Sequence, residues 1–337
     1  MNLLKKITSV FKRDTDLEYK ISSQLDLFEK GVFKCEKCSK IFRLEDYEPL
    51  EMFSCPNCSN LNFIPMRIGR FWLFQPLGGG GMGSVYKACH TKYKDDYYAV
   101  KILPREGKNN KLLVDALINE IKAANSFGIH PNITAVVSSG NKNGEYYYAM
   151  EFAVGERMDN LIDRKGKIPQ RDITRYALQL LSAEQHMYDA GYLFRDLKPE
   201  NIIITKEDNA ILYDFGLCMH VEEARTIPED MINGSPFYLP PERISGTGEN
   251  MYSELYSLGQ VMYHGLAGKT FFNAKEASAL AKKHVAKLRL SLKGNMLKQI
   301  DPRLVDLLGR LMKKETEKRP QTFFEVEKEL YQIYETL

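Results

Sequence analysis

The stretch GYLFRDLKPENIII, residues 191–204, carries an Arg-Asp pair at 195 and 196, Lys198 two positions after the aspartate and Asn201 five positions after it. In this spacing, Asp196 suits the acceptance or orientation of a hydroxyl proton, and Lys198 suits the neutralisation of a phosphoryl group in transfer. Asn201 suits the binding of Mg²⁺. Phosphoryl transfer needs mainly positioning and charge neutralisation, so this loop predicts that chemistry.

A glycine-rich stretch, FWLFQPLGGGGMGSVYKA at 71–88, predicts a strand, a turn and a second strand that begins at Ser84. Gly78, Gly80 and Gly83 fit the pattern G-x-G-x-x-G, and glycine lets backbone amides approach phosphate oxygens. A plain hairpin and a dinucleotide-binding turn are the alternatives. The latter needs a helix after the glycines, whereas SVYKACH predicts a strand, so a hairpin that covers phosphates is favoured.

The next apolar strand, YYAVKIL at 97–103, contains one lysine, Lys101. It could be an outward-facing strand residue, or it could pair with the α- and β-phosphates of a nucleotide and require an acidic partner. The helix predicted for KLLVDALINEIKAANSF offers Glu120 on its central turn, with Asp115 less well placed. AILYDFG adds Asp214 at a strand end, suited to hold Mg²⁺.

These motifs occur in the order LGGGGMGSVY, YAVK, Glu120, HPNI, RDLKPEN, DFG, GSPFYLPPE and EKRPQT. In this order, residues from about 68 to 337 resemble a eukaryotic-type protein kinase, closest to bacterial serine/threonine kinases. The resemblance implies an α+β bilobal fold. It implies a small five-stranded N-lobe with one main helix at 68–153 and a larger, mainly helical C-lobe at 154–337.

The resemblance also implies that ATP binds between the lobes with Mg²⁺ held by Asn201 and Asp214. Lys198 in DLKPEN resembles the serine/threonine class rather than the tyrosine class, which implies a protein substrate with a Ser or Thr acceptor. The residues implied to line the adenine pocket are Val85, Ala99 and Ile203, with Met150 as gatekeeper and Glu151 to Ala153 as the hinge.

Three positions depart from the family pattern. Phe194 replaces a histidine that packs beneath the Phe of DFG, here Phe215, and we expect an aromatic pair to compensate for the lost hydrogen bond. Glu254 replaces an aspartate that caps the catalytic-loop backbone. Pro240 replaces the alanine of APE, and the following Glu242 is expected to pair with Arg319.

Arg195 resembles the arginine that binds a phosphorylated activation-loop residue in many kinases. Thr226 is the better candidate phosphosite, because Ser235 matches a substrate-contacting position. An acidic residue, Glu222, Glu223, Glu229 or Asp230, could instead satisfy Arg195, and the sequence does not separate the two possibilities.

Four of the six cysteines, Cys35, Cys38, Cys55 and Cys58, form the pattern C-x₂-C-x₁₆-C-x₂-C. Two C-x-x-C turns brought together by short strands at 40–43 and 62–64 complete a tetrahedral site suited to Zn²⁺. Four cysteine ligands leave no open coordination position, so a structural zinc ribbon over residues 31–64 is predicted. Free or redox-active thiols are the alternative.

The remaining features place limits on partners and location. The N-terminal 1–30 segment begins with MNLLKKITSVFKR, which could form an interfacial helix on acidic lipid, although packing on its own protein is favoured. Residues 277–300 hold six Lys/Arg and no acid, which predicts a solvated face or, less simply, a docking surface. The ribbon has no basic surface, so a protein contact or spacer role is expected and nucleic-acid binding is not.

We therefore expect a cytoplasmic, ATP-dependent protein serine/threonine kinase with Asp196 as the base. No run of 18 apolar residues occurs, and the cysteine pattern favours a reducing compartment. The main alternative is a pseudokinase scaffold that binds nucleotide and presents the ribbon without phosphoryl transfer. A nucleic-acid-binding ribbon with an accessory kinase is disfavoured because the basic patch is missing.

Overall fold

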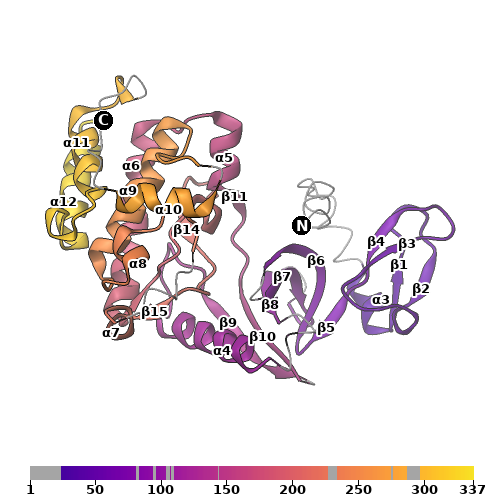
Figure 1. The fold of residues 1–337 in the computed structure, drawn as a ribbon. Coiled ribbons are helices and arrows are strands. Elements are labelled where there is room, and N and C mark those ends of the chain that lie inside the picture. The colour runs from indigo at the N-terminus through magenta and orange to yellow at the C-terminus, as the bar shows by residue number, and fades with distance from the viewer. Residues whose placement is uncertain are drawn as a thin grey trace. The chain divides into compact units, whose positions relative to one another are not determined.

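The computed structural model divides the chain into two compact units. The first unit holds residues 1–121 and 136–152, and the second holds residues 122–135 and 153–337 (Figure 1). The amphipathic segment at 1–13 lies outside the described residues. Those comprise 24–337 except 81–82, 94–95, 104–106, 108–109, 143, 227–233, 275 and 287–296.

An antiparallel six-stranded sheet forms the centre of the first unit, in the order β5-β6-β7-β8-β10-β9. Five strands were expected. The additional strand, β5, has only three residues, which form a tight hairpin with β6 across Gly69, and so short a segment gives no periodic pattern. The sheet strands are β5 (Met66–Ile68), β6 (Phe71–Gly80), β7 (Gly83–His90), β8 (Tyr97–Ile102), β9 (Val136–Lys142) and β10 (Glu145–Glu151).

The sheet has a different apolar cluster on each face, because alternate residues of a strand point to opposite sides. In β8, Val100 and Ile102 pack with Leu73 and Tyr147 on one face. Ala99 packs on the opposite face with Leu117 of helix α4 (Lys111–Ser126). Lys101 has the parity of Ala99, so the alternation directs it to the face where α4 packs.

The N-terminal ribbon consists of a short helix, a 3₁₀ turn and two hairpins. Its apolar core is continuous with the sheet: Phe28 and Phe33 belong to the same buried cluster as Trp72 and Phe74 of β6. The Trp72 Nε1 also donates a 2.7 Å hydrogen bond to Glu29. The elements are α3 (Leu25–Glu29), β1 (Val32–Lys34), β2 (Ile41–Arg43), η1 (Leu44–Asp46), β3 (Met52–Ser54) and β4 (Leu61–Phe63).

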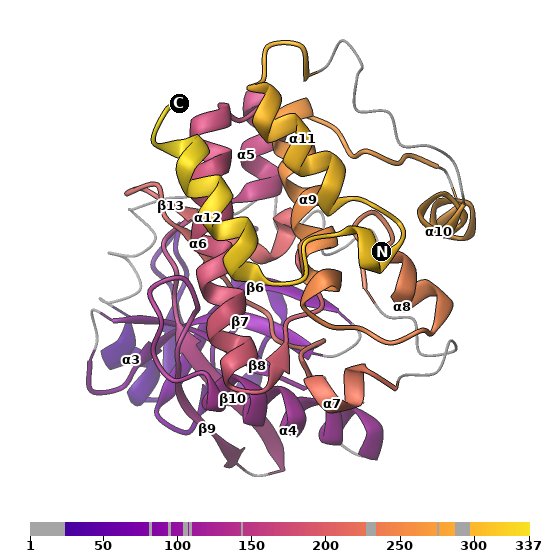
Figure 2. The ribbon, with the colours of Figure 1, turned by 90° about the vertical axis from the view of Figure 1, so that its left-hand side faces the viewer.

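The second unit is mainly helical and is built around α9 (Met251–Ala267), which is buried along most of its length. Asn250 and Ser253 form a capping box at its start, and Gly268 ends it with φ 71°. Within the described residues, no helix is long and apolar enough to span a membrane. The other helices, most of them visible in Figure 2, are α5 (Met158–Lys165), α6 (Gln170–Asp189), α7 (Val221–Ala224), α8 (Pro241–Ser245), α10 (Ala277–Val285), α11 (Pro302–Leu311), η5 (Thr316–Lys318) and α12 (Phe323–Tyr334).

Two small sheets carry the loops of the second unit. One sheet has the order β11-β13-β14, and the other pairs β12 with β15. A 3₁₀ turn, η3 (Pro199–Asn201), leads directly into β13. The strands are β11 (Gly155–Arg157), β12 (Tyr192–Leu193), β13 (Ile202–Thr205), β14 (Ala210–Leu212) and β15 (Met219–His220).

Candidate active site and cysteine cluster

A buried ion pair joins β8 to α4 in the first unit. The Nζ of Lys101 lies 2.7 and 2.9 Å from the two carboxylate oxygens of Glu120. The Tyr148 hydroxyl donates a further hydrogen bond to Glu120 at 2.5 Å. Asp115, the competing partner, is exposed, so the expected choice of Glu120 is confirmed. The pair holds one ammonium group in a fixed position on the face of the sheet where α4 packs.

The glycine-rich segment is an antiparallel hairpin in which Gly80 pairs with Gly83. Because β7 follows the glycines as a strand, the predicted hairpin geometry is confirmed and a dinucleotide-binding turn is excluded. Gly83 has φ 140°, and a Cβ there would lie 2.9 Å from the Ile102 carbonyl oxygen and 3.4 Å from the Lys101 side chain. Only glycine allows this close approach beside Lys101.

The residues expected to line an adenine pocket belong partly to each unit. In the first unit, Ala99 and Met150 are buried and Val85 packs against them in one apolar cluster. Glu151 ends β10 and is exposed. The second unit contributes two half-buried residues, Ala153 before β11 and Ile203 within β13.

Asp196 lies at the centre of a polar cluster in the second unit. Its Oδ2 accepts hydrogen bonds from Lys198 Nζ at 2.6 Å and from Asn201 Nδ2 at 2.8 Å. The Asn201 amide also donates to the Asp196 carbonyl at 2.9 Å. Burial raises the pKa of Asp196, and Lys198 and Asn201 oppose that rise. The structure thus brings together three residues that the sequence pattern singled out.

The hairpin of β13 and β14 explains how Asn201 and Asp214 come to the same end of one sheet. Ile202 pairs with Leu212, and one position further out the Tyr213 N–H donates to the Asn201 carbonyl at 3.2 Å. Asp214 follows immediately, in a left-handed backbone conformation with φ 66°. Two oxygen-bearing side chains suited to Mg²⁺ therefore belong to one local structure.

Phe194, the residue in place of the family histidine, is buried with 1% exposure. Its ring lies 6.2 Å from that of Phe215 in an edge-on arrangement, as expected for an aromatic pair. Phe127, in the turn directly after α4, packs on Phe215 at 5.4 Å between ring centroids. Phe194 therefore packs in the apolar interior beneath the segment that carries Asp214.

Glu254 caps the catalytic loop, as its position predicted: Oε1 accepts the Arg195 N–H at 2.9 Å. Sequence analysis did not detect its neighbour, Glu184 of α6, which is equally buried. Burial raises the pKa of Glu254 to about 7 and that of Glu184 well above its ordinary value. In the described part of the chain, no hydrogen-bond donor reaches Glu254 Oε2 or either Glu184 oxygen. Burial and the neighbouring Glu254 carboxylate therefore both favour the protonated form of Glu184.

The expected pairing of Glu242 with Arg319 is confirmed. It is bidentate, at 2.7 and 2.8 Å, and both side chains are almost fully buried. Ser253 at the start of α9 also donates to Glu242 at 2.6 Å. Pro240 leaves this ion pair intact.

Within the described residues, the acid that contacts Arg195 is Glu249, which the sequence did not single out. Glu222, one of the four acids considered, pairs instead with Arg225 on the surface. Glu229 and Asp230 lie outside the described residues. Thr226 is exposed, and its hydroxyl donates to the Glu223 carbonyl. Glu249 lies in the loop between α8 and α9, where no repeat or motif marks it.

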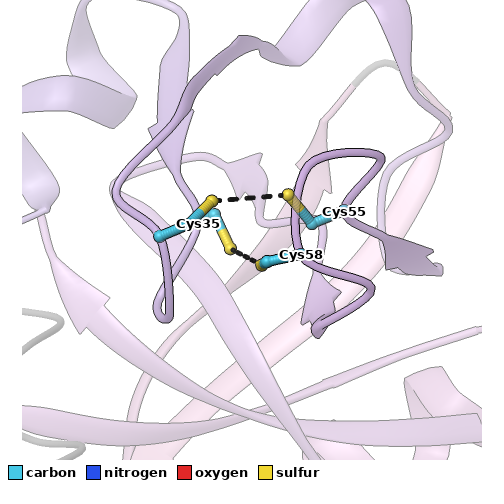
Figure 3. Close-up of side chains that lie close together, drawn as sticks. Cys35, Cys55 and Cys58 are labelled. Carbon is cyan, nitrogen blue, oxygen red and sulfur yellow. Dashed lines mark hydrogen bonds between the residues drawn. The ribbon is translucent and has the colours of Figure 1, made fainter.

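The four cysteines of the ribbon converge at one point. Two similar turns face each other, with Cys35, Cys55 and Cys58 directed inward (Figure 3). In each turn the first cysteine N–H bonds to the carbonyl five positions on, at 2.8 Å in both cases. Ser39 and Ser59 follow the second cysteines with φ 62° and 57°.

The sulfur positions fit a tetrahedral metal site. The Cys35–Cys58 and Cys38–Cys55 sulfur separations are both 3.6 Å, and all four sulfurs lie within 4.8 Å of one another. Zn–S bonds of about 2.3 Å require sulfur separations of about 3.8 Å in a tetrahedron. None of the four forms a disulfide. The cluster is therefore compatible with zinc.

The comparisons with known proteins all indicate the same protein family. The protein kinase domain model matches residues 71–331. A probable serine/threonine-protein kinase of Clostridium perfringens is 31% identical over 264 residues, which cover 78% of this chain and 38% of that protein. The serine/threonine-protein kinase PrkC of Bacillus subtilis is 30% identical over 64% of this chain and 33% of its own.

A probable serine/threonine-protein kinase PknB of Lactococcus lactis is 27% identical over 64% of this chain and 34% of its own length. The chain thus spans between a third and two fifths of these three curated relatives. The family model alone covers more than half of the chain, in the region that holds the Lys101–Glu120 pair and the Asp196 cluster. This chain belongs to the protein kinase family.

Proposed function

We propose that this protein is a serine/threonine kinase that transfers the γ-phosphoryl group of Mg-ATP to a hydroxyl group of a protein substrate. The observation that carries the proposal is the cluster in which Lys198 and Asn201 both contact Asp196 Oδ2. Relatives of this chain are named as serine/threonine-protein kinases, which also supports the proposal.

In the proposed reaction, Asp196 accepts the proton of the Ser or Thr hydroxyl as that oxygen forms a bond to the γ-phosphorus. The bond between the γ-phosphorus and the bridging oxygen breaks, and ADP leaves. Lys198 neutralises charge on the phosphoryl group, and Lys101, held by Glu120, binds the α- and β-phosphates. Mg²⁺ held by Asn201 and Asp214 supplies further charge neutralisation when bound.

The nucleotide base is proposed to contact Val85, Ala99 and Met150 from the first unit and Ile203 from the second, with hydrogen bonds to the backbone at Glu151 and Ala153. The hairpin at Gly78, Gly80 and Gly83 is proposed to cover the phosphates. Phe194, Glu254 and Pro240 replace none of the residues assigned to charge or metal, which disfavours a pseudokinase scaffold.

A transfer assay with radiolabelled ATP and a generic protein substrate tests the proposal. We expect Asp196→Ala and Asp214→Ala to reduce transfer by at least about 10³-fold, because each removes a group that positions or neutralises the reaction. Asp306→Asn is the matched control, since Asp306 is exposed on α11. If the unaltered protein transfers no more phosphate than Asp196→Ala, it is a scaffold and the proposal is wrong.

We also propose that Cys35, Cys38, Cys55 and Cys58 bind one structural Zn²⁺. Four sulfur ligands leave no position for a substrate. Elemental analysis of the purified protein should give one zinc per chain, retained in Cys218→Ser and lost in a Cys38→Ser, Cys58→Ser double variant. Equal zinc content in all three proteins would contradict the assignment.

A metal site of reduced thiols supports a cytoplasmic location, which cell fractionation would test. A protein contact through the ribbon is a further part of the proposal, supported by exposed Ile41 and Leu61 on its strands. A pull-down with Ile41→Ser and Leu61→Ser variants would test it, and unchanged capture would contradict it.

A further inference from the structure

The side chain of Arg195 is enclosed within the second unit. Its Nε and Nη2 donate to Glu249 Oε1 at 3.0 and 2.7 Å, and Nη1 lies 3.3 Å from the Met219 sulfur. Arg195 is 6% exposed and Glu249 is 2% exposed. The guanidinium is therefore neutralised by a carboxylate of the folded chain.

The second oxygen of Glu249 binds another arginine. Arg243 Nε donates to Oε2 at 2.7 Å, and its Nη2 donates to the same oxygen at 2.5 Å. Arg243 is also buried, at 6% exposure. Burial opposes ionisation of Glu249, but Arg243 and Arg195 together hold its pKa below the ordinary value. One carboxylate with two guanidinium partners resembles the way arginines surround a phosphate group.

This cluster fixes the backbone next to Asp196. Arg195 has φ 67°, a conformation that non-glycine residues avoid. Its N–H donates to Glu254, and its carbonyl accepts a hydrogen bond from Arg243 Nη1. Glu249 orients Arg243, so the same carboxylate controls both the Arg195 side chain and one of its peptide groups.

Glu249 also connects the cluster to the segment that follows the DFG motif. Its N–H donates to the Ala224 carbonyl of α7 at 2.9 Å. Gly248, with φ 85°, lies so close that a Cβ there would be 2.5 Å from the Arg225 carbonyl oxygen. The described part of this segment is thus tied to Glu249 directly before Thr226.

From this geometry we propose that Glu249 is a positioning residue that takes the place of an activation-segment phosphate. It neutralises Arg195, orders the backbone of Asp196 and anchors α7, so phosphoryl transfer does not require phosphorylation of Thr226. The inference rests on the proposed kinase function and concerns its regulation. Glu249 contacts no reacting atom and acts through Arg195 and Arg243.

The test compares steady-state kinetics of five full-length proteins: the unaltered chain, Thr226→Ala, Glu249→Gln, Asp196→Ala and the control Glu222→Gln. Glu222 is an exposed carboxylate close in sequence to Thr226 that pairs only with Arg225 among the contacts resolved for its side chain. All are treated with a protein phosphatase, which is then removed, and mass spectrometry verifies that Thr226 carries no phosphate. The unaltered chain is also assayed without this treatment, with its Thr226 phosphate measured, as the reference.

We expect the treated unaltered chain, Thr226→Ala and Glu222→Gln to keep kcat within about twofold of the untreated unaltered chain. Glu249→Gln keeps the shape but removes the charge, so kcat should fall about 100-fold because the base is misplaced. Its KM for ATP should change less than about threefold, since Glu249 contacts no residue assigned to the nucleotide. A purely structural role would lower the active fraction and leave the pH profile of kcat unchanged, whereas loss of positioning shifts that profile.

A kcat of Thr226→Ala, or of the treated unaltered chain, more than tenfold below that of the untreated unaltered chain would overturn the inference, as would unchanged kcat in Glu249→Gln. If Glu249→Gln fails to fold, kcat of the phosphate-free Thr226→Ala protein still shows whether phosphoryl transfer requires phosphate on Thr226. In addition, Glu249→Asp, which keeps the charge, should recover part of kcat. Transfer by the untreated unaltered chain that only equals Asp196→Ala would instead refute the proposed function, and the inference with it.

Discussion

The cysteine cluster and the loop that carries Arg195 and Asp196 both contain non-glycine residues in a left-handed backbone conformation, but different contacts hold them there. Both place functional side chains beside non-glycine residues of positive φ: Ser39 and Ser59 in the ribbon, and Arg195 and Asp214 in the second unit. Such a conformation costs about 1–2 kcal/mol per residue. In the ribbon, backbone hydrogen bonds within five positions hold each turn. Arg195 is held by side chains 48 to 59 positions away.

The difference teaches where each site is vulnerable. A turn held by its own backbone needs only its local sequence and the proposed zinc that would join it to a second turn. A loop held by distant side chains depends on the packing of α8 and α9 and on every buried charge between them. The predictions below separate these two kinds of dependence.

The largest effect is expected from removing the zinc proposed to bind the four cysteines. Structural zinc contributes on the order of 10 kcal/mol to the folding of small metal-dependent modules. Because Phe28 and Phe33 share a core with Trp72 and Phe74, the loss should also lower the stability of the six-stranded sheet. Thermal unfolding with and without a strong chelator should show a drop of the first-unit transition, and Cys55→Ser should show it without chelator.

Cys218→Ser in the presence of zinc is the control, because Cys218 lies outside the cluster. If the unfolding transition of the first unit is unchanged after complete metal removal, verified by elemental analysis, the ribbon turns are stable without the metal.

The next largest effect is expected from breaking the buried ion pair between Glu242 of α8 and Arg319. Replacing Glu242 with alanine leaves Arg319 buried without its carboxylate, which typically costs 3–5 kcal/mol. Denaturant unfolding should show this loss in the second-unit transition. Glu315→Ala is the control: its pair with Lys318 is exposed, and its loss should cost less than about 1 kcal/mol. Equal losses in the two variants would contradict the comparison.

A smaller effect is expected from the acid pair beneath the loop. Folding raises the pKa of Glu254 to about 7 and that of Glu184 well above its ordinary value, so the folded state binds protons that the unfolded state releases. The stabilisation from the protonated pair is complete below the unfolded pKa of about 4.5 and is lost as pH rises through 7 and above. The free energy of unfolding should therefore fall by on the order of 1–2 kcal/mol between pH 6 and 9.

Glu184→Gln keeps a hydrogen-bond donor but cannot ionise, so unfolding curves across this pH range should show a smaller slope. Glu223→Gln, on the exposed face of α7, should keep the slope of the unaltered protein. A Glu184→Gln protein with an unchanged slope would show that the pair does not titrate in this range.

The smallest effect is expected at Phe194. Phe194→His should change kcat by less than about threefold, because the position packs on Phe215 and lies outside the groups assigned to charge and metal. The lost aromatic contact and the regained hydrogen bond should nearly balance, each being about 1 kcal/mol. A variant many-fold faster than the parent would indicate that the loop has begun to lose function.

Much of the fold could be predicted because its signals are local. The motif order, the glycine-rich hairpin and the cysteine spacing each lie within a few residues of sequence. The pairing of Lys101 with Glu120 also follows from strand alternation and helix position. By contrast, β5 is too short for a periodic pattern, and the core shared by the ribbon and β6 needs Trp72 and Phe74 to face opposite to Leu73.

The sequence by itself determined which residues are proposed to bind phosphate, Mg²⁺ and zinc, because those chemistries demand particular side chains at short spacings. Only the tertiary structure decided what supports them. Glu249 was missed as the partner of Arg195, and Glu184 as the partner of Glu254, because a carboxylate far along the chain has no pattern of its own. Its role arises when folding buries it, since in a low-dielectric interior a charge must have a partner or a proton.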